Sequence, residues 1–189
     1  MEAIANLLFE ARSLRTLPRS GYQFLGAGRE SVAEHTFSIT FIAYVLSRLV
    51  PEADGQKMMT MCLVHDLPEA RIGDLNSVQK LYITADEPAA VCDLTAPLPF
   101  GEELKASIEE FNRGESLEAK LARDADQIAF ILELKDLSDI GYVPPGTWIP
   151  SIRRRLQTEI GQQLVEAILA TERDAWWRHK FIDRTDHNK

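Results

Sequence analysis

The sequence has 189 residues, of which 45% are hydrophobic and 26% charged, a balance typical of a single globular domain with a sizeable core. Its formal net charge of −8 argues against a nucleic-acid polymer or an anionic membrane surface as partner, because both need a basic patch. The two cysteines, Cys62 and Cys92, are not closely spaced, so neither a disulfide framework nor a zinc knuckle is expected. With no signal-peptide pattern and no apolar stretch of about 20 residues, the chain is expected to be cytoplasmic.

Apolar residues recur with a helical period along the chain, and no window alternates as a half-buried strand does, so the sequence predicts an all-α fold. Helices are expected over residues 2–14, 31–50, 56–70, 102–111 and 117–139, with a short one inside 87–99 and the last helices over 151–179. Glycine and proline predict loops over 19–26 and 141–146. Residues 184–189 are expected to form a flexible polar tail, which leaves 1–183 as one helical domain.

The second predicted helix has a clear start signal. Ser31 is placed to cap it, and Glu34 completes a capping box. Its apolar stripe consists of Ile39, Ile42, Leu46 and Leu49. His35 continues this stripe, so an imidazole is expected on the inward face.

The third predicted helix contains an imidazole and two carboxylates close together. His65 and Asp66 are adjacent, and Glu69 follows one helical turn after His65. Pro68 is expected to tighten or bend the end of this helix. Such a mixture of donors suits a borderline or hard divalent metal ion.

The long helix predicted over 117–139 adds a further carboxylate. Its core stripe consists of Leu117, Leu121, Ala125, Ile128 and Leu132. Asp126 is flanked one turn either way by Ala122 and Ala129, whose small side chains leave space beside its carboxylate. Asp124 is the main rival of Asp126 as a ligand.

Taken singly, each of these groups has an ordinary explanation. A histidine on an apolar stripe is more often a hydrogen-bonded core residue, and Asp126 beside Arg123 could form a surface ion pair. Taken together, three helices would each place a polar group on an inward face, which costs several kilocalories unless a shared cation or proton network satisfies them. The set therefore favours a metal site.

The motifs resemble the HD-domain metal-dependent phosphohydrolases. The order of elements matches, with His35 at the end of Glu-Ser-Val-Ala-Glu-His (30–35), then His65-Asp66, then Asp126 at the end of Lys-Leu-Ala-Arg-Asp-Ala-Asp (120–126). More narrowly, the sequence resembles the 5'-deoxynucleotidase branch, which includes HD-domain-containing-protein-2-like members. This resemblance lies in segments 17–22, 31–35, 65–69 and 73–75. The resemblance covers about residues 14–141 and implies a single helical HD-domain bundle.

The resemblance also implies roles for individual residues. The ligands of one divalent metal ion would be His35, His65, Asp66 and Asp126. Glu69 matches the proton-handling carboxylate, Asp74 an acid that contacts substrate or helps to activate water, and Arg19 the arginine that meets the phosphate. Arginine suits planar, bidentate phosphate binding. Asp126 is preferred to Asp124 because it aligns with the family motif.

The implied activity is release of phosphate from (deoxy)nucleoside 5'-monophosphates by metal-activated water. The histidines outside the motifs, His179 and His187, are near the C-terminus, which favours a mononuclear site. Mixed imidazole and carboxylate donors admit Mn, Co, Fe, Zn or Mg. Whether Glu69 accepts the proton of water or donates one to the leaving alkoxide stays open, because either role needs only a poised carboxylate.

The sequence departs from some 5'-deoxynucleotidases at the loop that helps to select deoxyribose over ribose. Some 5'-deoxynucleotidases have a tryptophan directly after the phosphate-binding arginine, whereas here Ser20 follows Arg19 and Tyr22 is the first aromatic residue. Tyr22 either contacts substrate or packs the loop. Alternatives to the leading hypothesis are hydrolysis of another phosphate ester, such as an alarmone, and a non-catalytic helical binding module stabilised by metal. The resemblance also implies a homodimer.

Overall fold

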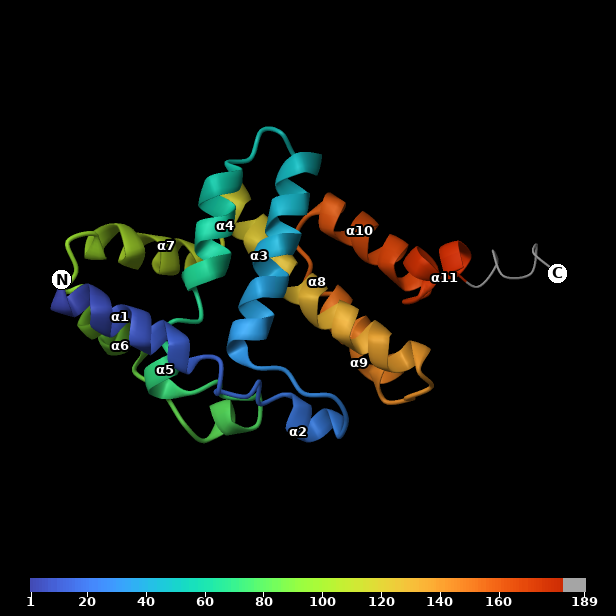
Figure 1. Cartoon of the computed structure of the whole chain (residues 1–189), viewed down its shortest axis with the longest axis horizontal. Coiled ribbons are helices and arrows are strands. Elements are labelled where there is room, and N and C mark those ends of the chain that lie inside the picture. The colour runs from blue at the N-terminus through green and yellow to red at the C-terminus, as the bar shows by residue number, and fades with distance from the viewer. Residues whose placement is uncertain (182–189) are drawn as a thin grey trace.

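The computed structural model describes residues 1–181, and its regular elements are helices, as predicted (Figure 1). In chain order they are α1 (Glu2–Ser13), α2 (Tyr22–Leu25), α3 (Val32–Leu49), α4 (Gly55–Val64), α5 (Glu69–Ile72), the 3₁₀ turn η1 (Gln79–Leu81), α6 (Glu87–Thr95), α7 (Gly101–Arg113), α8 (Leu117–Asp139), α9 (Pro145–Arg153), α10 (Glu159–Ala170) and α11 (Ala175–Phe181). The tail predicted over residues 184–189 lies outside the described residues. Within residues 1–181, no helix combines the length and the apolar character needed to cross a lipid bilayer.

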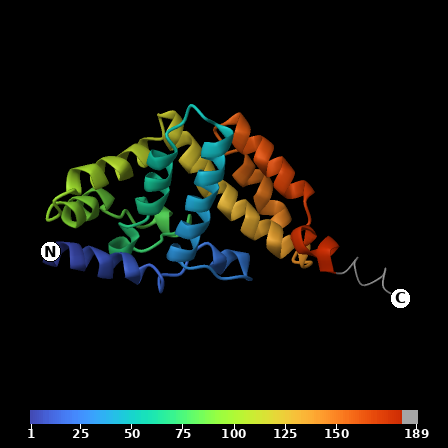
Figure 2. The same cartoon turned by 45° about the horizontal axis from the view of Figure 1, so that its top comes forward.

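Three helices, α3, α4 and α8, pack against one another at the centre of the molecule (Figures 1 and 2). Helices α9 and α10 contact α8 on one side of this centre. On the other side, α7 contacts α4 and α8, α6 contacts α7, and α5 contacts both α1 and α6. The predicted capping box at the start of α3 is confirmed, since the Ser31 hydroxyl accepts from the Glu34 amide and the Glu34 carboxylate accepts from the Ser31 amide.

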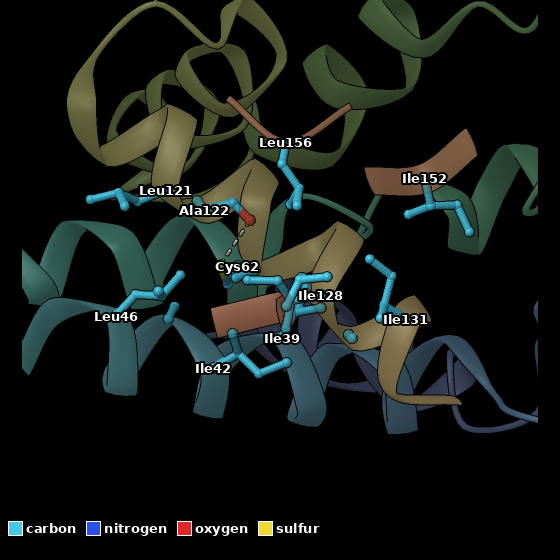
Figure 3. Packing of buried hydrophobic residues seen from close by; sticks show 14 of the residues in the cluster. Ile39, Ile42, Leu46, Cys62, Leu121, Ala122, Ile128, Ile131, Ile152 and Leu156 are labelled. Carbon is cyan, nitrogen blue, oxygen red and sulfur yellow. Dashed lines mark hydrogen bonds between the residues drawn. The ribbon is translucent and has the colours of Figure 1, made fainter. Parts of the chain in front are cut away.

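The buried side chains form two hydrophobic clusters. The larger cluster joins α3, α4, α8, α9 and α10, and Figure 3 shows Ile39, Ile42 and Leu46 of α3 with Cys62 of α4 and Leu121, Ile128 and Ile131 of α8. The smaller cluster includes Val32, Val64 and Ile108 and lies toward α1, α6 and α7. His35 follows Val32 and precedes Ile39 on α3, so its imidazole lies where the two clusters meet.

Three residues predicted in core stripes lie on the surface instead. Leu49 of α3 and Leu117 and Leu132 of α8 are exposed. Leu49 and Leu117 belong to terminal turns, where a helix extends beyond its neighbours. Because α8 is packed by helices on opposite sides, it buries a broad face, including Ala119, Ile131 and Leu134, rather than the single predicted stripe.

The helix predicted over 56–70 is in fact two helices separated by a turn. After α4 ends, the backbone amides of Leu67 and Glu69 donate to the carbonyls three residues earlier, Val64 and Asp66. Pro68 has no amide hydrogen, so a continuous α-helical bond pattern cannot pass through it. Pro68 therefore interrupts the predicted helix, whereas only a tightening or bend of its end was expected.

Two predicted loops contain helical turns. Segment 19–26 includes the short helix α2, and α9 begins at Pro145, before the predicted start at Ser151. Proline at the first helical position is pre-organised for a helix and has no amide to leave unpaired. The Pro-Pro-Gly sequence thus starts a helix here rather than prolonging the loop.

Candidate metal and phosphate site

His35 and Asp126 are brought together from α3 and α8. The His35 side chain is buried, and its Nε2 lies 2.8 Å from Oδ1 of Asp126. The other ring nitrogen, Nδ1, faces the buried carboxylate of Glu30 at 3.7 Å. A carboxylate on this side of the imidazole favours a proton on Nδ1 and leaves Nε2 able to bind a cation. Glu30 was not predicted as part of the site.

His65 and Asp66 converge because the chain leaves the α-helical path after α4. In a regular helix, adjacent side chains do not face each other. Here Nε2 of His65 lies 3.0 Å from Oδ1 of Asp66, while Nδ1 of His65 is 3.1 Å from the Cys62 carbonyl oxygen. When Nδ1 carries a proton and donates it to that carbonyl in a hydrogen bond, Nε2 is the ring nitrogen that faces the carboxylates. The turn that contradicts the predicted helix is thus the feature that joins this pair.

The donor atoms of His35, His65 and Asp126 all lie within 4.8 Å of one another. Asp66 is not in this trio, although its Oδ1 contacts His65. Its other oxygen, Oδ2, is buried and has no hydrogen-bond partner among the described residues. Imidazole nitrogens and carboxylate oxygens around a buried, unsatisfied acceptor fit a divalent cation.

The charges of these residues stabilise one another. Burial alone would lower the pKa of His65, but the charge of Asp66 and the hydrogen bond to it raise that pKa to about 9. Burial alone would raise the pKa of Asp126, but the hydrogen bond and charge of His35 hold it well below its usual range. A proton therefore occupies His65 where a cation would bind, and metal binding there would release it.

Arg19 lies beside these donor atoms in the segment that precedes α2. Its Nη1 is 3.6 Å from Oδ2 of Asp66, and its Nε is 3.7 Å from Oδ2 of Asp74. The same Asp74 oxygen accepts a hydrogen bond of 2.9 Å from the Ser20 amide. Asp74 thus holds both the backbone and the side chain of the arginine segment, and the guanidinium lines a cavity.

Glu69, the first residue of α5, lines the same cavity. Its Oε2 is buried and has no hydrogen-bond partner in the described part of the chain. Burial, followed by the charges of Asp66 and Asp74, raises the pKa of Glu69 to about 8. A carboxyl group with this pKa holds its proton at neutral pH.

The rivalry between Asp124 and Asp126 is explained by their positions on α8. Residues two apart on a helix point to nearly opposite sides. Asp124 is fully buried and accepts from the amides of Gln157 and Thr158, at 2.7 and 2.9 Å, and from the Thr158 hydroxyl at 2.5 Å. Its oxygens therefore bind the start of α10, and they are not available to a metal ion at the site of Asp126.

The cavity has a volume of about 990 Å³. Its wall includes Arg19, Tyr22, His65, Asp66, Glu69, Asp74 and Asp126. Tyr22 has an interaction of its own, because its hydroxyl lies 3.1 Å from Oε2 of Glu133, to which it donates. The ring is thus anchored to α8 while it lines the cavity.

Several residues of the site were not predicted. Gln127 donates from Nε2 to Oδ2 of Asp126 at 2.7 Å, and the Phe111 ring packs 4.3 Å from that of His65, centroid to centroid. Glu30 lies within the motif that ends at His35, and this proximity was the available signal. The contacts of Gln127 and Phe111 depend on how α7, α8 and the turn after α4 pack against one another. The pattern of apolar residues along the sequence does not predict such packing.

Comparison with known families gives a match to the HD domain over residues 11–168. Among curated proteins, the 5'-deoxynucleotidase HDDC2 of Homo sapiens is 28% identical over 137 residues, which cover 69% of this chain and 66% of the human protein. The Dictyostelium discoideum protein of the same name is 31% identical over 134 residues, covering 64% of this chain and 70% of that protein. The chain thus matches just under two thirds of the human relative's length.

Solved structures share the fold. A conserved hypothetical protein from Pyrococcus furiosus superposes with a TM-score of 0.77 at 24% identity, over 88% of this chain and 99% of the other. A predicted metal-dependent phosphohydrolase from Magnetospirillum magnetotacticum superposes with a TM-score of 0.70 at 21% identity, over 89% and 90%. The helical arrangement around the site is therefore common to these proteins.

Proposed function

Because the chain belongs to the HD domain family, we propose that it is a metal-dependent phosphohydrolase that releases phosphate from (deoxy)nucleoside 5'-monophosphates. The observation that carries this proposal is the convergence of donor atoms from His35, His65 and Asp126 beside a cavity that Arg19 lines. Similarity to proteins named 5'-deoxynucleotidase supports the substrate class.

We assign four residues as the ligands of one divalent cation, namely His35, His65, Asp66 and Asp126. The donor trio and the buried Oδ2 of Asp66, which accepts no hydrogen bond from the described residues, support this set. These residues would hold a cation that, when bound, would lower the pKa of a water molecule and withdraw charge from the phosphoryl oxygens. The donors suit Mn, Co, Fe, Zn or Mg. Glu30 acts as a positioning residue, since its carboxylate faces Nδ1 of His35.

Arg19 is the proposed phosphate-binding residue. Its planar guanidinium can offer two parallel N–H donors to phosphate oxygens. Asp66 and Asp74 flank the guanidinium, so it is oriented before substrate arrives. We therefore give Asp74 a positioning role through Arg19 and the Ser20 amide, rather than a role in activating water.

Glu69 is the proposed proton-handling residue. Its raised pKa of about 8 means that the carboxyl group is protonated at neutral pH. A protonated carboxyl group in the cavity can donate to the alkoxide that leaves when the ester P–O bond breaks. We propose proton donation rather than proton abstraction as the role of Glu69, and the raised pKa supports this choice.

A panel of phosphate-release assays tests the proposed function. The substrates are ribo- and deoxyribonucleoside 5'-monophosphates, the corresponding 3'-monophosphates, triphosphates and an alarmone, each assayed with the five metals, and Asp66→Ala is the inactive control. Phosphate is expected from 5'-monophosphates, with little from the 3' isomers. Failure on every 5'-monophosphate with every metal contradicts the proposal, and cleavage of the alarmone alone favours the other phosphate-ester hypothesis.

A homodimer and a cytoplasmic location stay predictions. One side of α3 is a candidate contact face, because Phe37, Phe41 and Tyr44 are exposed along it and their rings pack in sequence. Exposed apolar patches often mark protein interfaces, and two copies could pair this stripe about a two-fold axis.

A further inference from the structure

The cavity extends beyond the residues that a metal ion and a phosphate would contact. Pockets of about 300–1,000 Å³ enclose whole drug-sized ligands, so a volume of about 990 Å³ leaves room for the rest of a nucleotide. Beyond the metal ligands, one wall comes from α9 and the turn after it, through Thr147, Trp148, Ser151, Ile152 and Arg155. Steps of three and four residues place these side chains on a single face.

An aromatic pair joins this wall to the reaction centre. Phe130 follows Asp126 on α8 by one helical turn, so the two side chains are neighbours on the same helix face, roughly 5–6 Å apart at Cβ. The Trp148 ring lies 6.1 Å from that of Phe130, centroid to centroid, at an interplanar angle of 74°. The aromatic pair therefore begins one helical turn from the proposed metal ligand Asp126.

The part of the wall formed by segment 75–85 is less suited to a planar ligand. Segment 75–85 contributes Val78, Lys80 and Ile83, and none of its lining residues is aromatic. By contrast, Trp148 and Phe130 both pack against the larger hydrophobic cluster, which holds their rings in place. Rigid aromatic planes stack on every nucleobase.

Resting on the proposed function, we propose that Trp148, with Phe130 behind it, forms the nucleobase subsite. The base stacks on Trp148, while the Ser151 hydroxyl and the Arg155 guanidinium bind polar atoms on its edge. These groups contact the part of the substrate that does not react. They therefore govern binding of the nucleotide and not the chemical step.

The test compares a nucleoside 5'-monophosphate with ribose 5-phosphate, which has the reacting group but no base. Affinity is measured by calorimetry on the metal-loaded full chain carrying Glu69→Gln, in which turnover is expected to be slow, and hydrolysis by phosphate release without that substitution. Trp148→Ala is expected to raise KM and Kd for the nucleotide by about ten-fold or more, and to leave both within about two-fold for ribose 5-phosphate. Trp148→Phe, which keeps an aromatic plane, is expected to restore most of the affinity.

A second variant covers the risk that Trp148→Ala disturbs the core. Ser151→Phe keeps the tryptophan and narrows the cavity at this wall, so it is expected to impair the nucleotide and spare ribose 5-phosphate. Equal effects on both ligands, or no effect on either, would overturn the subsite. If the wild-type protein binds the nucleotide but hydrolyses neither compound with any metal, the proposed function fails while the affinities still decide the subsite.

Discussion

Replacing Glu69 by glutamine is expected to lower kcat by about 10²–10⁴-fold, the usual contribution of a general acid or base. The amide fills nearly the same volume and can form hydrogen bonds, but it cannot give up a proton to the leaving alkoxide. Oε2 of Glu69 has no hydrogen-bond partner in the described part of the chain, so the substitution breaks no hydrogen bond there that holds a proposed metal ligand. Metal content and thermal unfolding are therefore expected to stay close to those of the wild type.

A matched control for this variant is Asp74→Asn, which alters another carboxylate of the same cavity. Because Asp74 acts through Arg19 and the Ser20 amide, this change is expected to raise KM more than it lowers kcat. Steady-state kinetics and metal analysis of both variants make the comparison. An unchanged kcat for Glu69→Gln would show that the proton is handled by another group.

Replacing Asp126 by alanine is expected to weaken metal binding by more than about a hundred-fold, since loss of even an outer-shell partner typically costs about 10–100-fold. Phosphate release is expected to be lost with the metal. Asp124→Ala is the matched control from the same helix. It removes an acceptor of three hydrogen bonds and is expected to cost about 3 kcal/mol of unfolding free energy while the metal stays bound.

Metal analysis and denaturant unfolding of the two variants separate these effects. The assignment of Asp126 is wrong if Asp126→Ala retains a full complement of tightly bound metal. The structural assignment of Asp124 is wrong if its alanine variant loses the metal and keeps wild-type stability.

The helices were predictable where local signals are strong. The Ser31–Glu34 capping box begins α3 as expected, and Ser116, whose hydroxyl accepts from the Ala119 amide, caps α8 at its predicted start. Both signals depend only on residues close in sequence. The inward position of His35 followed from the stripe of α3, because that face meets α4 and α8.

The same reasoning could not reveal how the turn at 65–68 arranges the site. In the continuous helix predicted over 56–70, the adjacent side chains of His65 and Asp66 would not face each other, whereas the break before Pro68 brings them together. Position in the motif favoured Asp126 over Asp124. The physical reason appears only in three dimensions, where the start of α10 supplies the hydrogen-bond donors for Asp124.

The part of the cavity next to α9 was the hardest to predict from the sequence, because it is formed by tertiary packing. Residues 145–148 were predicted within or beside a loop, but α9 starts there and turns Trp148 toward Phe130 of α8. No pattern local to either segment predicts this contact. The reacting end is thus encoded in short motifs, and the end that would select the ligand arises from packing of α8 and α9.

The central claim is that phosphate release depends on one cation held by His35, His65, Asp66 and Asp126. The most direct measurement is phosphate release from a deoxynucleoside 5'-monophosphate by the full chain after chelation, as a divalent cation is returned in substoichiometric steps. The rate is expected to fall to background on chelation, to rise in proportion to bound metal and to level off at about one ion per chain. A chelated, metal-free protein that retains the full rate would contradict the claim.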